Sequence, residues 1–299
     1  MPDIADIHVN RPLTNLSLQY RNSGYVADRL FPVIPVIKDS DTFYVYGKEA
    51  FRAEETRRAP RTAAPIISWG VTTDTYSCVE HALSDRIDDT ERRNADQPLN
   101  LDVDSVNILT DKLLLGMEQR VAALMTNVGV WSNNSPSHGW DEASGTPVKD
   151  VQDAVASIIM MRANTMVMSQ SVYDALLQSS DILARIQYAE RGVVTLDLMK
   201  ALFGVPNILV ASAIYDTAAE GQTPSMSYVW NDTVWIGYVA PSPGLRQASA
   251  GYCFRSKGMT VRKWREEAQH SDAIEVGYCQ SEEITCAELG VLLTNVLQA

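Results

Sequence analysis

The 299-residue sequence predicts an α+β protein, and three observations support that class. Residues 103–128 carry apolar side chains at steps of three and four, which is the pattern of a long amphipathic helix. Residues 150–213 alternate between short helical and strand patterns, and strand patterns dominate from residue 226 onward. Helical and strand segments that are partly segregated along a chain are typical of this class.

The N-terminal residues predict an extended arm followed by a long β-hairpin. In residues 1–39 the apolar side chains are scattered between turn signals and prolines, so this segment needs another surface to lie on. Residues 40–85 then contain two strand patterns, Thr42–Tyr46 and Val71–Val79. No short-hairpin turn dipeptide joins them, and we therefore expect a long projecting loop.

The stretch from Lys48 to Arg61 is basic within an acidic chain. It holds five basic and three acidic residues, a balance of +2, while the whole chain has a formal charge of −12. Its one aromatic residue, Phe51, makes it a poor site for single-stranded nucleic acid, which needs basic charge interleaved with stacking aromatics. We expect it to dock on protein. The candidate contact residues are Lys48, Arg52, Arg57, Arg58 and Arg61.

Residues 85–118 carry the opposite charge, with nine acidic and four basic residues and a balance of −5. Complementary patches on copies of one chain suppress wrong pairings between them, so we expect the basic loop to dock on this region of a neighbouring copy. A solvated, charged loop is the alternative. The candidate acidic contacts are Asp88, Asp89, Glu91, Asp102 and Asp104.

The long helix begins with favourable charges and ends at a clear stop. Asp102 and Asp104 fall in its first turn, where the helix dipole favours negative charge, and Asn127 with Gly129 ends it. Residues 131–147 are rich in Ser, Asn, Gly and Pro and predict a boundary between two lobes. The predicted apolar stripe consists of Val103, Val106, Leu109, Leu113, Met117, Val121, Leu124 and Val128.

No catalytic, cofactor or metal motif is found. The phosphate-binding and dinucleotide-binding glycine patterns, the nucleophile elbow and the zinc helix motif are absent, and the four cysteines contain no C-x-x-C pair. Acidic residues near Asp85 alternate with arginines, which favours a salt-bridged turn over a cation site. We expect a non-enzyme without cofactor. The sequence has neither a membrane-spanning stretch nor a signal peptide pattern, so we expect a cytoplasmic protein.

Several strings occur in an order that is characteristic of one family. They are Tyr25–Val36 with Phe43–Tyr46, Asn164–Ser169 leading into Val172–Leu177, and Phe203–Val210. The sequence of parts agrees: an arm, a hairpin with a charged tip, a long helix, a mixed lobe and returning strands. In these features the chain resembles the major capsid protein family of tailed bacteriophages, which has the Hong Kong 97-type fold. No string is a chemical motif, and the order of the strings carries the resemblance.

The resemblance implies a division into an N-terminal arm, an extended loop, a peripheral domain with a spine helix, an axial domain and strands that return to the peripheral domain. The corresponding ranges are 1–39, 40–85, 86–149, 150–250 and 251–299. Some family members join subunits by a Lys–Asn isopeptide bond. Lys48 lies in the corresponding loop, but neither the Asn nor the catalytic Glu can be identified by motif.

The resemblance also implies a function and partners. The chain would assemble with itself into hexamers and pentamers of an icosahedral head shell that encloses double-stranded DNA without sequence-specific binding. It would be located in the virion after assembly in the bacterial cytoplasm. No helical scaffolding extension precedes the arm, so we expect a separate scaffolding protein, with portal and decoration proteins as further partners.

Three other functions stay open on the sequence alone. An encapsulin-like compartment shares the fold but holds protein cargo, so nucleic acid inside the particles would distinguish the two. A cytoplasmic hydrolase using paired carboxylates would be a small oligomer with measurable turnover. A tail or decoration protein would form rings, tubes or trimers instead of closed shells.

Overall fold

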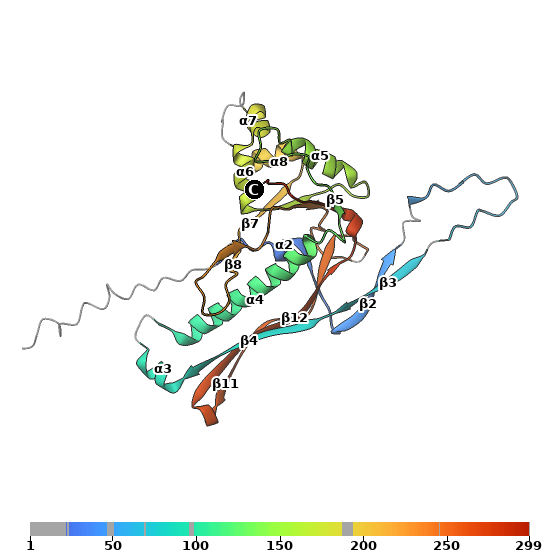
Figure 1. The fold of residues 1–299 in the computed structure, drawn as a ribbon. Helices are drawn as coiled ribbons and strands as arrows, with labels where there is room; N and C mark the ends of the chain where they lie inside the picture. Colours follow the sequence, from blue (N-terminus) through green and yellow to red (C-terminus); the bar gives the residue numbers. More distant parts are fainter. Residues whose placement is uncertain are drawn as a thin grey trace, which may run out of the picture.

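The computed structural model consists of two β-sheets packed against one long helix, α4 (Leu101–Met125) (Figure 1). One sheet has four strands and the other has five, and two further two-stranded ribbons are present in the described part of the chain. This content confirms the predicted α+β class. The structure describes residues 22, 24–46, 51–68, 70–95, 99–186, 194–244 and 246–298.

A short helix and a short strand open the described chain. α2 (Ala27–Leu30) packs into a core shared with the C-terminal half of α4. β1 (Val33–Pro35) pairs in parallel with the start of β11 (Gly251–Glu266). The end of the predicted arm is therefore built into the fold, whereas residues 1–21 of the arm lie outside the described residues.

The predicted extended hairpin is confirmed. β2 (Ser40–Tyr46) pairs antiparallel with β3 (Val71–Ser77), from Ser40 opposite Ser77 to Tyr46 opposite Val71. Figure 1 shows the connection between the two strands projecting away from the rest of the molecule. Its described residues, 51–68, contain no strand and are all exposed. The hairpin therefore presents a long loop, as the missing turn dipeptide indicates.

The four-stranded sheet has the order β1-β11-β12-β4 and carries α4 on one face. β4 (Val79–Asp88) continues from β3 and pairs antiparallel with β12 (Ser271–Ile284), which pairs on its other side with β11. The helix confirms the predicted stripe except at its ends, because Val103 and Val128 are exposed. The core beneath α4 is formed by Ile87, Leu109, Leu113, Ile274, Val276 and Tyr278.

The five-stranded sheet has the order β5-β13-β10-β6-β7. Its interior strand β6 (Thr165–Ser169), between β10 and β7, is buried along its whole length, since neighbouring helices cover it. The remaining strands are β5 (Ser132–Asn133), β13 (Gly290–Leu293), β10 (Val234–Gly237) and β7 (Asn207–Ala211). The helices of this region are α5 (Pro147–Ser157), α6 (Gln170–Gln178), α7 (Ser180–Ile186) and α8 (Leu196–Phe203). A separate two-stranded ribbon consists of β8 (Ile214–Asp216) and β9 (Met226–Tyr228).

The C-terminal strands do not all return to the same sheet, which corrects the sequence-based division. β11 and β12 join the four-stranded sheet. β13 instead pairs with β10 and with β5 in the five-stranded sheet. The segment 131–147, expected as a boundary, supplies β5 and the fully buried Trp140. Short apolar strands such as β13 fit either sheet, and only long-range pairing decides between them.

Candidate functional site

The first candidate surface is the tip of the extended loop, and among its described basic residues Arg52, Arg57 and Arg58 make local contacts. The Arg52 guanidinium lies 4.0 Å from the Glu54 carboxylate. The backbone N–H of Arg57 donates to Glu55 Oε1 at 2.9 Å. Lys48, the fifth basic residue expected here, lies outside the described residues.

A tight turn shapes the same tip. The Nε of Arg58 donates to the carbonyl oxygen of Thr62 at 2.6 Å, and the backbone N–H and hydroxyl of Thr62 donate to the carbonyl oxygen of Ala59 at 3.3 and 2.7 Å. Arg61 takes a left-handed backbone conformation with φ of 61°. Neither Arg58 nor Arg61 forms a salt bridge with any residue that the structure describes. The turn therefore fixes the shape of the tip and leaves its positive charge facing solvent.

The second candidate surface lies where β4 ends and α3 (Asp89–Asn94) begins. α3 starts with a capping box: Asp88 Oδ1 accepts the Thr90 N–H at 2.6 Å, and Glu91 Oε2 accepts the Asp88 N–H at 3.3 Å. The bond from Thr90 holds the pKa of Asp88 below its usual value. These two carboxylates therefore stabilise the turn between the sheet and α3.

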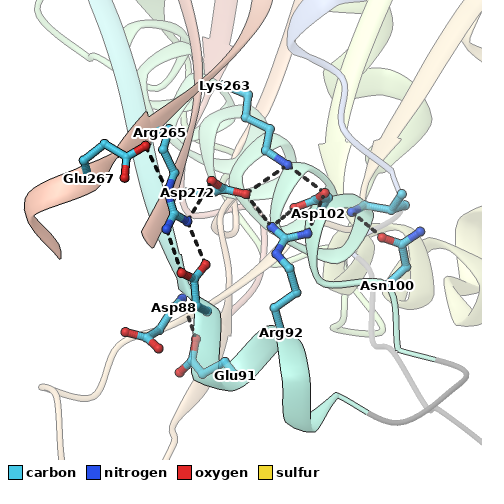
Figure 2. A network of polar contacts seen from close by, with 11 residues as sticks. Asp88, Glu91, Arg92, Asn100, Asp102, Lys263, Arg265, Glu267 and Asp272 are labelled. Carbon is cyan, nitrogen blue, oxygen red and sulfur yellow. Dashed lines mark hydrogen bonds and ion pairs between the residues drawn. The ribbon is translucent and has the colours of Figure 1, made fainter. Parts of the chain in front are cut away.

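The acidic residue at the start of α4 is bound by two cations from different elements. Figure 2 shows Asp102 accepting hydrogen bonds from Arg92 at 2.8 and 3.2 Å and from Lys263 at 2.9 Å. Both cations also reach Asp272, at 3.0 Å from Arg92 and 3.5 Å from Lys263. The contacts join α3, α4, β11 and β12 at one end of the four-stranded sheet.

Asp89 and Asp104, the remaining predicted acids, belong to the same corner of the molecule. The Arg265 guanidinium binds both oxygens of Asp89 at 2.6 and 2.7 Å and reaches Asp272 at 3.3 Å. Asp104 Oδ2 accepts the backbone N–H of Asn100 at 3.2 Å. The five acidic residues that the sequence singled out therefore lie at this corner; Figure 2 labels Asp88, Glu91 and Asp102 there.

We call this set the α3–α4 network. The network keeps a negative balance of −4, because it contains seven carboxylates and three cations. The hydrogen bond from Arg92, followed by that from Lys263, lowers the pKa of Asp102 to about 2, and the bond from Arg265 lowers that of Asp89. Its members are Asp88, Asp89, Glu91, Arg92, Asp102, Asp104, Lys263, Arg265, Glu267 and Asp272.

Sequence reasoning missed the half of this network that comes from β11 and β12. Lys263, Arg265 and Asp272 follow the acidic region by about 160 residues, and their only local signal is a charged run near a strand turn. The spacing of two residues between Lys263 and Arg265 could have placed both on one face of a strand. Pairing with β4 could not be read from the sequence, so the neutralising cations were not assigned to the acidic region.

A third feature is a buried carboxylate that ties the arm to the long helix. Glu118, in the middle of α4, is fully buried and accepts the backbone N–H groups of Val26 and Ala27 at 3.0 and 2.9 Å. It also accepts the indole N–H of Trp230 at 2.7 Å. Burial raises the pKa of Glu118, and these three donors oppose the rise. One side chain thus holds three segments of the chain together.

The described residues offer little for small-molecule chemistry. Among them, no group of three or more His, Cys, Asp or Glu side chains is placed to hold a metal ion. No helix in the described ranges has the length and apolarity needed to cross a membrane. A cavity of about 560 Å³ lies between α2 and the five-stranded sheet, and its charged lining residues are Asp28, Arg29 and Lys200.

Comparison with known proteins gives the family. The chain is 31% identical over 307 residues to the major capsid protein of Burkholderia phage BcepMu, and the match covers 96% of both chains. The chain belongs to the phage major capsid protein family. The major capsid protein of Pseudomonas phage JBD67 is 23% identical, with 99% of both chains covered. No family model matches the sequence.

Solved structures agree with this assignment. A phage-related protein from Bordetella bronchiseptica has a TM-score of 0.74 at 27% identity, with 94% of both chains covered. The capsid of the myovirus XM1 has a TM-score of 0.60 at 12% identity, covering 96% of this chain and 98% of the other, which bears on the fold alone. The capsid protein therefore has the Hong Kong 97-type α+β fold, forms the head shell of a tailed phage and is located in the virion.

Proposed function

We propose that each capsid subunit docks the tip of its extended loop on the α3–α4 network of a neighbouring copy. Two observations support this proposal. Residues 51–68 are exposed throughout and project from their own subunit (Figure 1). The tip carries a balance of +2 between Lys48 and Arg61, while the α3–α4 network keeps −4 after its internal ion pairs are counted. The opposite charges of the two surfaces favour this arrangement of neighbouring subunits over incorrect arrangements.

The proposed contact suits assembly because each one is weak. Exposed ion pairs contribute about 0 to 1 kcal/mol each, so a single misplaced subunit can dissociate again. A closed shell joins every subunit to several neighbours, and many weak contacts sum to strong association. Docking of the loop requires no rearrangement of the subunit that carries it. The contact can therefore control assembly without affecting folding.

Several finer assignments belong to the same proposal. We assign the N-terminal arm to residues 1–39, the extended loop to 40–85 except for residues 79–85, which belong to β4 of the four-stranded sheet, and the spine-helix domain to 86–149. The axial domain is 150–250 and the returning strands are 251–299, with β13 assigned to the axial sheet. Subunits form hexamers and pentamers in the host cytoplasm with a separate scaffolding protein. The shell receives a portal and a decoration protein, encloses double-stranded DNA without reading its sequence, and is not an enzyme.

Electron microscopy tests the assembly state directly. The chain is expressed alone and with the neighbouring scaffolding gene, and lysate pellets are imaged by negative stain. We expect closed shells built of hexamers and pentamers. Nuclease-resistant double-stranded DNA inside shells from an infection is the second expected result. A small oligomer that never closes, even with the scaffold present, would contradict the proposal.

The docking itself is tested by charge reversal at the tip. Arg57→Glu with Arg58→Glu should leave the subunit folded and remove normal shells, because the tip then carries the same sign as the network. Arg57→Lys with Arg58→Lys keeps the charge and serves as the matched control, which should still assemble. Circular dichroism reports folding, and electron microscopy with sedimentation reports shells. Normal shells from the reversed variant would reject charge-directed docking.

A further inference from the structure

The two edges of the four-stranded sheet differ in how they are protected. β11 forms one edge, and β1 covers its first residues, Cys253 to Arg255. Beyond that point the pairing of β11 with β12 has register shifts on both sides of Lys257, and Lys257 and Lys263 lie along the strand. Bulges and lysines are the means by which proteins prevent an edge strand from pairing with another chain. The β11 edge is therefore blunted.

β4 forms the opposite edge and has none of these protections. Its ten residues pair with β12 from Val79 to Asp88 without a register shift, and the strand contains no Pro, Gly or Lys. In the described part of the chain no strand pairs with its outer side. Val79 and Leu83 are 55% and 38% exposed, so apolar surface accompanies the open backbone groups. Such an edge is a template for a further strand.

The charges along β4 are complementary to a second copy of the same strand. The strand reads Val-Glu-His-Ala-Leu-Ser-Asp-Arg-Ile-Asp from residue 79 to residue 88. If two copies run antiparallel with Leu83 opposite Leu83, Glu80 lies opposite Arg86 and His81 lies opposite Asp85. The two-fold axis repeats each pair. We infer that β4 pairs with β4 of a second subunit across a two-fold axis and joins two four-stranded sheets into one.

The side-chain alternation and the charges select this register. Directly opposed residues in an antiparallel pair share a face, so a symmetric pairing can shift only in steps that keep odd residues opposite odd ones. Centring the pair on Ser84 places Glu80 opposite Asp88, which is repulsive. Centring it on Ala82 places Glu80 opposite Ser84 and leaves no opposite charges facing each other. Of these three registers, the Leu83 register alone places a carboxylate opposite an arginine, and the axis repeats this Glu80–Arg86 pair.

The intrachain partners of these residues remain compatible with the pairing. Arg86 lies 3.2 Å from Glu266, and Glu80 lies 3.4 Å from Lys257. These contacts come from β11 on the far side of β12, and both Arg86 and Glu80 retain at least half of their side-chain exposure, 60% and 59%. An opposing strand can therefore reach both side chains. The edge pairing is separate from loop docking, because it uses neither the loop nor the α4 acids.

A cysteine scan across the axis tests the inference at the backbone. In antiparallel pairs the Cα atoms of opposed residues are about 4.5 to 5.5 Å apart, within the range that a disulfide spans. Leu83→Cys should therefore cross-link two subunits in assembled shells under mild oxidation, as a dimer band on a non-reducing gel. Ala82→Cys and Ser84→Cys should not, because neither faces itself in this register. Val261→Cys, on the blunted β11 edge, is the control and should stay monomeric.

A charge exchange tests the same pairing without cysteines. Glu80→Arg and Arg86→Glu should each reduce shell yield, since each opposes like charges twice across the axis. The double variant restores opposite charges between subunits. Within each subunit it places a positive side chain beside Lys257 and a negative side chain beside Glu266, so both intrachain ion pairs become repulsive. Recovery of shells in the double variant would therefore have to come from the restored contacts between subunits. Absence of a Leu83 cross-link in shells, a cross-link at residue 82 or 84 instead, or a double variant no better than the singles would overturn the inference.

Discussion

Two segments near the N-terminus, the arm root and the extended loop, both carry apolar side chains but differ in where those side chains lie. The arm root, residues 22–31, contains Phe31 and Leu30 with almost no exposure and binds the buried Glu118. The loop, residues 51–68, exposes Phe51, Ile66 and Ile67 at 74%, 97% and 64%. The arm root is partly helical through α2 (Ala27–Leu30), whereas residues 51–68 contain no strand. The apolar residues of the arm root are therefore buried within the subunit, whereas those of the loop are exposed on it.

This difference separates folding from assembly in the capsid protein. Burial of apolar side chains stabilises a subunit by about 25 cal/mol per Å² of area removed from water, and the arm root gains this stabilisation in the isolated chain. The loop gains it only when another surface covers the loop. Substitutions at the arm root should therefore change the free energy of unfolding, and substitutions in the loop should change assembly alone.

The largest effect on stability is expected at Glu118. Glu118→Ala leaves the Val26, Ala27 and Trp230 donors buried without an acceptor, so the free energy of unfolding should fall by about 3 to 5 kcal/mol. Urea unfolding of unassembled subunits, followed by tryptophan fluorescence, measures it. Gln119→Ala, at the exposed neighbouring position of α4, is the control and should change stability little. A loss as small as that of the control would mean that the arm root is held by apolar contacts alone.

A smaller effect is expected from acid at the α3–α4 network. The pKa of Asp102 is about 2 in the fold and 3.8 ordinarily, so its stabilising contribution is complete above pH 3.8 and is lost as the pH falls toward 2. The contribution is about 1 kcal/mol or less because the pair is partly exposed. Stability measured from pH 6 to pH 2 should fall less steeply for Asp102→Asn than for the parent chain. Asp197→Asn, in α8, should retain the parent slope.

The smallest effect on stability is expected in the loop. Ile66→Ser with Ile67→Ser should leave the unfolding free energy within about 0.5 kcal/mol of the parent value, because neither side chain packs on its own subunit. The same variant should form fewer shells, since the loop loses the apolar area that a neighbour would cover. Light scattering during assembly and urea unfolding measure the two properties. A clear loss of subunit stability would remove the distinction between the loop and the arm root.

The outline of the fold was predictable because its signals are local. The stripe from Leu109 to Val121 predicts α4, and the absence of a turn dipeptide between β2 and β3 predicts the projecting loop. The resemblance of ordered strings supplied the family. The placement of β13 was not predictable, because the sequence of a four-residue strand does not specify which strand it pairs with. The sequence identified Asp89 and Asp102 as part of an acidic region. It did not identify Lys263 and Arg265 as the cations that bind them.

The sequence by itself determined the long helix, the hairpin strands, the sign of charge on the loop and on the long helix, and the family. Periodicity, turn chemistry and composition depend on neighbours within a few residues, and these quantities can be read along the chain. The tertiary structure alone decided that Glu118 is buried against the arm root, that the network is closed by β11 and β12, and that β4 keeps an open edge. Each of these depends on pairing between residues roughly 90 to 180 positions apart, which the order of residues does not record.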